Sequence, residues 1–194
     1  MAKILGNFVY ARVIALVLLA AAMFGLHRGA MDAGYWMEFA RFLHIFAGIL
    51  WIGLLYYFNF VQIPTMPSVP AELKPGVTKH IAPVALFFFR YSALVTVIVG
   101  LVLAELRAPG YLKNALLFQE PSFRTIGIGM WLGLVMAANV WFVIWPNQKR
   151  ALGIVAAEDD VKARSATNAM MASRINFILS LPMLYCMVMG AHIG

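Results

Sequence analysis

Apolar residues fill five long stretches of this chain, and short segments rich in charge, proline or glycine separate them. A helix needs about 20 apolar residues to cross the hydrocarbon core of a bilayer. Open strands would leave backbone groups unbonded in lipid, so each stretch is expected to be a helix. The predicted helices lie near residues 8–26, 36–62, 83–106, 123–145 and 170–193. The pattern predicts an all-α integral membrane protein, a single domain over residues 1–194 built as a bundle of about five transmembrane helices.

Composition agrees with this pattern. The chain is 63% hydrophobic and 12% charged, with a mean hydropathy of +0.83, which excludes an ordinary soluble domain. The single cysteine, Cys186, excludes a disulfide framework and the two-cysteine attachment of a c-type haem. The net charge of +7 arises from basic residues at helix ends, so we expect no nucleic acid partner.

The distribution of basic residues predicts the orientation. The first stretch is long and lacks a convincing cleavage site, so we interpret it as a retained helix. Basic residues on the face that carries the N-terminus are Lys3, Lys74, Lys79, Lys149, Arg150, Lys162 and Arg164. Those on the opposite face are Arg28, Arg107, Lys113 and Arg124. The excess of positive charge predicts a cytoplasmic N-terminus and a periplasmic C-terminus.

The connecting segments give three smaller predictions. Residues 64–70 contain three prolines, so this loop is expected to be extended and to end the second helix. Residues 158–160 are acidic and precede Lys162 and Arg164, which is typical of a solvated helix start rather than an acidic site. Apolar and aromatic residues between Arg107 and Arg124 predict a short segment lying in the membrane interface.

His44 is the first candidate for chemistry, because an ionisable side chain at bilayer depth is costly unless something pairs with it. His44, Gly48 and Trp51 share one helix face at i, i+4 and i+7. This face offers an imidazole, a gap beside the backbone and an aromatic wall, an arrangement that suits a haem. A neutral histidine bonded to a neighbouring helix is the alternative, and this stripe alone does not separate the two.

His192 is the candidate for a second haem ligand. Gln62 to His44 and Arg174 to His192 each span about 27 Å of helix, which places the two histidines at one level if Gln62 and Arg174 share a depth. Two antiparallel helices could then hold the haem iron between these histidines. Arg41, one turn from His44, is a candidate partner for a haem propionate, although it could pair with Glu38 instead.

Other polar residues within the predicted helices suggest a second kind of site. Four of them could line a cavity for a small anion or a quinone head, and they are Arg90, Asn139, Arg174 and Asn176. Arginine within a span is costly unless it faces a cavity or reaches the interface. Arg174 reaching the membrane surface is an equal alternative.

Four blocks of the chain, together with His192, resemble the N-terminal membrane domain of the bacterial membrane-bound urate oxidase (urate hydroxylase) family. They are HIFAGILWIG (44–53), FRYSALVT (89–96), NVWFVIWPNQK (139–149) and SRINFILSLPM (173–183). The first block is also similar to small membrane haem proteins of the bacterial protoporphyrinogen-oxidase type. This resemblance implies b-type haem held by helix histidines.

The chain also departs from that family. Family members usually have a longer membrane region and a C-terminal cytochrome c domain, and we expect this chain to lack that domain. Ile175 stands where the family often has a histidine after Ser-Arg. Urate turnover therefore does not follow from the shared scaffold alone.

Three functions are in view. The first hypothesis is a b-type haem electron-transfer protein of the bacterial inner membrane, part of a larger oxidoreductase system. The second is a urate-oxidase-like enzyme that passes electrons to a separate cytochrome c. The third is a cofactor-free structural subunit of a membrane complex. We expect a membrane protein partner or a homo-oligomer, with a cytochrome c or a quinone as the candidate electron partner.

Overall fold

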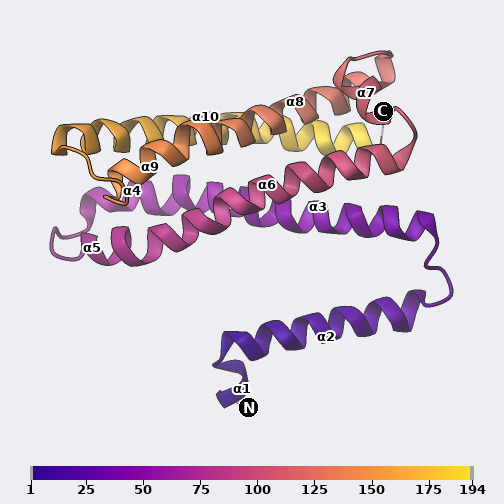
Figure 1. Cartoon of the computed structure of the whole chain (residues 1–194), viewed down its shortest axis with the longest axis horizontal. Helices are drawn as coiled ribbons and strands as arrows, with labels where there is room; N and C mark the ends of the chain where they lie inside the picture. Colours follow the sequence, from indigo (N-terminus) through magenta and orange to yellow (C-terminus); the bar gives the residue numbers. More distant parts are fainter. Residues whose placement is uncertain (1, 193–194) are drawn as a thin grey trace. The chain divides into compact units, whose positions relative to one another are not determined.

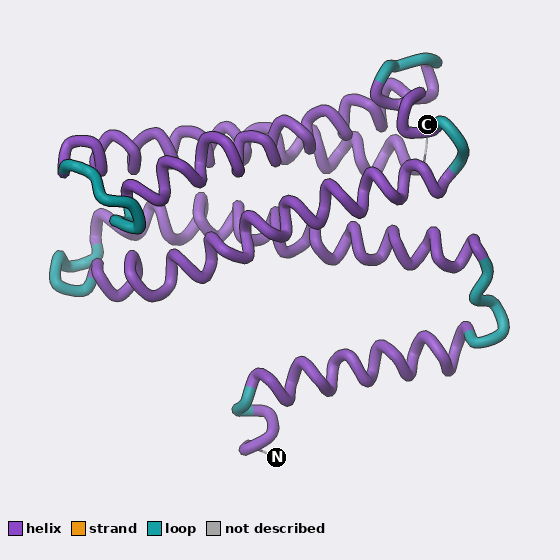
Figure 2. Tube along the Cα trace, viewed as in Figure 1, coloured by secondary structure: helices purple, strands orange, loops and turns teal. Residues whose placement is uncertain are grey.

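The computed structural model describes residues 2–192, which contain helices and loops and no strand (Figure 2). Five helical segments within that range are long and apolar enough to cross a membrane, as predicted. They span Phe8–His27, Ala33–Ser68, Lys74–Arg107, Pro121–Ala151 and Asp159–His192. The chain is therefore an all-helical protein with five candidate membrane spans.

Several spans are composite helices (Figure 1). The first span is α2 (Phe8–His27), preceded by the short α1 (Ala2–Leu5). The second joins α3 (Ala33–Tyr56), the π-helix η1 (Tyr57–Gln62), α4 (Ile63–Thr65) and the 3-10 helix η2 (Met66–Ser68). The third joins α5 (Lys74–Gly76), the π-helix η3 (Val77–Ile81) and α6 (Ala82–Arg107). The fourth joins the 3-10 helix η4 (Pro121–Phe123), α8 (Arg124–Asn139), the π-helix η5 (Val140–Ile144) and α9 (Trp145–Ala151). The fifth is α10 (Asp159–His192).

Contacts divide the chain into two units, Met1–Phe39 and Ala40–Gly194, which are described separately. In the first unit, the side chain of Asn7 accepts a hydrogen bond from the backbone N–H of Val9 and caps α2. Asp32 accepts from the N–H of Tyr35 in the same way at the start of α3. These caps explain where both helices begin. The single bundle of five helices stays a prediction.

The second unit packs antiparallel helices around one apolar core. Its core joins α3 and η1 to α6, α8 and α10. The largest fully buried apolar side chains in it are Trp51, Leu55, Phe89, Met136 and Val140. Small residues allow a close approach between α8 and α10: a Cβ on Gly190 would lie 2.7 Å from the backbone nitrogen of Ile126. The absent side chain of Gly190 therefore brings these two helices together.

The prediction for the proline-rich loop is wrong. The helix continues through Pro64 to Thr65, and a 3-10 turn then extends to Ser68. Pro64 has no backbone N–H to donate, and it follows the π-helix η1, where the α-helical bonding pattern is already interrupted. Val69, directly after this turn, has an extended backbone.

One of the other two connecting segments agrees with the sequence, and the interfacial position predicted for the other stays a prediction. A short helix, α7 (Tyr111–Leu116), lies between the third and fourth spans. The acidic run begins α10, with Asp159 bonded to Lys162 and Asp160 bonded to Arg164, each at 2.8 Å on the exposed surface. These pairs support a water-exposed first turn, so the helix starts well before the apolar run near residue 170.

Candidate functional site

The ring of His44 lies at the contact between α3 and α6. Its Nδ1 is 2.8 Å from the backbone oxygen of Thr96, and the side chain is half-buried. A carbonyl oxygen only accepts hydrogen bonds, so Nδ1 carries the proton and donates it. Nε2 is then left with its lone pair, which is the state in which an imidazole binds a metal.

Gly100 makes room for this ring. A Cβ at position 100 would lie 2.8 Å from Cε1 and 2.9 Å from Nδ1 of His44. Any side chain there would displace the ring from the carbonyl of Thr96. Gly100 therefore fixes the position of His44 by its lack of a side chain, a role that the sequence did not reveal.

The other residues predicted for the haem pocket have different surroundings. Gly48 faces α6, because a Cβ there would meet the Cγ2 of Thr96 at 3.8 Å. Trp51 is only 1% exposed within the apolar core, and its Nε1 has no hydrogen-bond partner. Both residues therefore contribute to the packing of α3 against neighbouring helices. Arg41 is half-buried on α3, one turn before His44.

His192 lies on the exposed last turn of α10. Its Nδ1 is 2.8 Å from the backbone oxygen of Val188, four residues earlier on the same helix. The same reasoning as for His44 gives Nε2 the lone pair. The two histidines therefore share one hydrogen-bonding state, although their bonds go to different helices.

The structure also bears on the depth of the two histidines. Tyr56 and Ser180 are hydrogen-bonded to each other at 3.1 Å, which puts them at one level. Twelve residues separate His44 from Tyr56, and twelve separate Ser180 from His192. At a rise of 1.5 Å per residue both histidines lie about 18 Å from this bond. The antiparallel directions of α3 and α10 carry them toward the same end.

Asn139 and Asn176, predicted as lining of a polar cavity, are bonded to each other. The Nδ2 of Asn139 donates to the Oδ1 of Asn176 at 2.8 Å and to the backbone oxygen of Ala172 at 2.9 Å. The Nδ2 of Asn176 donates to the backbone oxygen of Met136 at 3.0 Å, and Asn176 is fully buried. The pair fastens α8 to α10.

The two arginines of the same predicted set lie in different environments. Arg174 is exposed on α10, and its reach to the membrane surface stays a prediction. Arg90 on α6 is 8% exposed and stacks on the ring of Trp145 at 3.4 Å. The described contacts of Arg90 are thus aromatic, and they do not include the bonded asparagine pair.

Sequence reasoning missed a second set of bonds on α10. Ser173 accepts from the Nδ2 of Asn59 at 3.0 Å, and Ser180 bonds to Tyr56, so both serines join α10 to α3 and η1. With Asn176 they stand at i, i+3 and i+7 along one apolar helix. Polar residues at that spacing form a helix face, which is the signal that could have found them.

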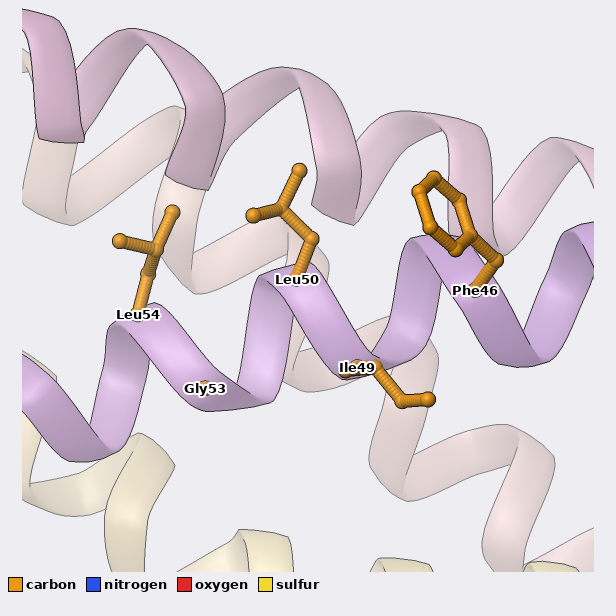
Figure 3. Close-up of a pocket in the computed structure, with 5 residues that line it drawn as sticks. All are labelled: Phe46, Ile49, Leu50, Gly53 and Leu54. Carbon is orange, nitrogen blue, oxygen red and sulfur yellow. The ribbon is translucent and has the colours of Figure 1, made fainter. Parts of the chain in front are cut away.

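A groove with a volume of about 280 Å³ lies along α3 (Figure 3). Only apolar residues and a glycine line it, and they are Phe46, Ile49, Leu50, Gly53 and Leu54. These side chains offer no ligand for a metal and no donor for an anion. The groove therefore takes no part in the candidate chemistry.

Comparisons with known proteins give one family. A search of curated proteins and a search of solved structures each found no match. A sequence model described as urate oxidase N-terminal matches residues 90–194, which is more than half of the chain. Three of the four sequence blocks that suggested this family lie within or across the start of the match, and His44 lies before it. The chain belongs to the urate oxidase N-terminal family.

Proposed function

We propose that this chain is a membrane-integral b-type haem electron-transfer protein, with His44 and His192 as the axial ligands. The observation that carries the proposal is the matched state of the two rings. Each Nδ1 lies 2.8 Å from a backbone carbonyl oxygen, so each Nε2 keeps its lone pair. A backbone carbonyl behind a ligating imidazole is the usual arrangement at metal sites, because it fixes the ring and raises its basicity.

The residues around His44 fit this role. The carbonyl of Thr96 orients the ring, and the absent side chain at Gly100 gives it space. The hydroxyl of Thr96 donates to the backbone oxygen of Ser92 at 2.7 Å, which satisfies it within α6. The described residues contain no cluster of three or more His, Cys, Asp or Glu side chains for a bare metal ion. Haem needs only two axial ligands from the protein, and when bound it supplies one-electron exchange.

Three further parts of the proposal come from the sequence. Arg41 would hold a haem propionate by charge-assisted hydrogen bonds from its place one turn before His44. The protein would lie in a bacterial inner membrane as a multi-pass chain, with a membrane partner or a second copy. A cytochrome c or a quinone would exchange electrons with it. Membership of the urate oxidase N-terminal family suggests an oxidoreductase-related function, which supports this choice over a purely structural one.

The same family membership favours a second candidate, oxidation of urate or a related small anion. The predicted polar residues do not strengthen it, because the amides of Asn139 and Asn176 already bond to each other and to backbone. Binding a substrate there would require those bonds to break. Anaerobic reduction of the haem by urate, saturating with concentration, would support this candidate, and no reduction would remove it.

The test of the main proposal is a dithionite-reduced minus air-oxidised spectrum of the purified protein. We expect b-type haem bands in the wild type and their loss in His44→Ala and His192→Ala. His80→Ala is the matched control, because His80 is exposed on η3 and lies before α6. A protein purified without haem after expression with ample haem supply would contradict the proposal. Bands unchanged in His192→Ala would remove that residue as a ligand.

A further inference from the structure

A buried cation lies among aromatic rings where α6 meets α9. The guanidinium carbon of Arg90 is 3.4 Å from the ring centroid of Trp145 and 5.7 Å from that of Tyr91. The rings of Trp141 and Tyr91 are in edge contact, and their centroids are 5.7 Å apart. We call Arg90, Tyr91, Trp141 and Trp145 the aromatic box. Cation–π contact stabilises a desolvated arginine but does not replace its hydrogen bonds.

Three buried donors of this box are unbonded. The Nε and Nη1 of Arg90 and the Nε1 of Trp141 are buried without a hydrogen-bond partner. A buried donor that makes no hydrogen bond destabilises the fold, and more so when the group is charged. The phenol oxygen of Tyr91 is an acceptor within the box, yet these three donors stay unbonded, and an oxyanion would satisfy them.

A second cation increases the positive charge at this place. The Nζ of Lys149 lies 5.7 Å from the ring centroid of the same Trp145. The described ion pairs that involve a lysine or arginine join Lys162 to Asp159 and Arg164 to Asp160, and neither includes Lys149 or Arg90. Two positive charges therefore lie near one indole ring, and neither forms an ion pair with a carboxylate of the described residues.

The depth of the box suggests where its ligand comes from. The span Pro121–Ala151 has 31 residues. At 1.5 Å per residue it is about 46 Å long, so it exceeds a hydrocarbon core of about 30 Å. Trp145 lies six residues, or about 9 Å, from the end of this span. A span centred in the bilayer would extend about 8 Å beyond the core at each end, which would place Trp145 at the boundary between acyl chains and headgroups, where tryptophan is common.

The outer surface beside the box is apolar and aromatic. Phe142 is 79% exposed, Phe87 is 48% exposed, and Tyr91 itself is 43% exposed. Such a surface suits acyl chains rather than the approach of a soluble anion. Tyr91 is the exposed edge of the box, so movement of its side chain would open the guanidinium of Arg90 to a headgroup.

We propose that the aromatic box and Lys149 form a binding site for the phosphate group of an acidic phospholipid. The phosphate oxygens accept hydrogen bonds from Arg90 and Trp141, while Lys149 adds a second charge at the membrane surface. This site is separate from the candidate haem ligand: Arg90 and Gly100, which contacts His44, are ten residues apart on α6, or about 15 Å.

The experiment titrates purified protein in neutral detergent with phosphatidylglycerol and counts bound lipid by native mass spectrometry. Each cation near the surface contributes about fivefold in affinity. We therefore expect about fivefold weaker binding in Arg90→Gln and in Lys149→Gln, and a smaller loss in Trp141→Phe. Arg107→Gln is the matched control, since Arg107 is an exposed arginine on the same helix that lies 5.1 Å from the ring of Tyr111.

Two further arms use phosphatidylcholine and inorganic phosphate as probes. Weak binding of phosphatidylcholine supports the proposal, because its headgroup has no net charge. Displacement of phosphatidylglycerol by millimolar inorganic phosphate would assign the site to a soluble oxyanion and overturn the lipid proposal. Equal affinity in the wild type, Lys149→Gln and Trp141→Phe would also overturn it, and these two variants decide the question if Arg90→Gln does not fold.

Discussion

The hydroxyl of Tyr56 donates a hydrogen bond to the Oγ of Ser180 and ties α3 to α10. The direction of this bond follows from a second one: Ser180 donates its only hydroxyl proton to the backbone oxygen of Phe177 at 2.7 Å. Tyr56 also packs edge to face on the ring of Phe177 at 5.7 Å. One tyrosine thus contacts two residues of α10 with its polar end and its ring.

The bond between Tyr56 and Ser180 can be measured by a double-mutant cycle. Hydrogen bonds between membrane helices contribute about 0.6 kcal/mol on average. We expect a coupling energy of about that size between Tyr56→Phe and Ser180→Ala, from unfolding in mixed micelles. Tyr185→Phe is the control, because Tyr185 is 62% exposed on α10. A coupling energy of zero would show that the bond adds nothing to stability.

Gly100→Ala tests the position of the His44 ring. The new methyl group would overlap Cε1 and Nδ1 of His44, so the bond to Thr96 should be lost. Overpacking of this kind typically costs about 1–3 kcal/mol. We expect lower thermal stability and a reduced ratio of haem to protein. Gly53→Ala is the control, because a Cβ there meets no atom within 4 Å. Equal haem content in both variants would contradict the role given to Gly100.

Asn176→Ala tests the bonded asparagine pair. The change removes the acceptor of Asn139 and the donor to Met136, and each is part of the α8–α10 contact. Leaving a buried polar group unbonded costs about 1–3 kcal/mol, so we expect destabilisation of that size in chemical unfolding. Asn168→Ala changes the same residue type at an exposed position of α10 and should have little effect. Matching losses in the two variants would refute a specific role for Asn176.

The predicted orientation can be tested by labelling cysteines in intact cells. In a Cys186→Ala background, Gln119→Cys should react with a membrane-impermeant maleimide, and Glu72→Cys should react only after permeabilisation. Both positions are exposed in loops between spans. The reverse pattern would place the N-terminus outside and show that the charge bias misled the assignment.

The number and type of the long helices could be predicted because the length of each apolar run can be counted in the sequence and compared with the thickness of a bilayer. Their ends were less predictable. Asp159 begins α10 through local ion pairs that a hydropathy pattern does not contain. Pro64 predicts the end of a helix, yet the helix continues through it, directly after a π-helix that a hydropathy pattern does not contain.

The candidate site was predictable in part. His44 stands out because a histidine is rare within an apolar run, and the structure gives it a specific bond. Gly100 could not be found, since nothing in a single sequence tells which helix faces a given histidine. Asn139 and Asn176 were recognised as polar and buried, but their pairing depends on the register of α8 against α10.

The π-helix η5 separates two residues whose side chains contact different helices. Asn139, just before it, bonds to α10, and Trp145, just after it, stacks on Arg90 of α6. A π turn holds one residue more than an α turn, so deleting one residue from Val140–Ile144 would leave an ordinary α-helix. Everything beyond the deletion would rotate by about 100° around the helix axis. The extra residue therefore sets the rotation of α9 relative to α8. Because of this rotation, one continuous helix can contact α10 before the π turn and α6 after it.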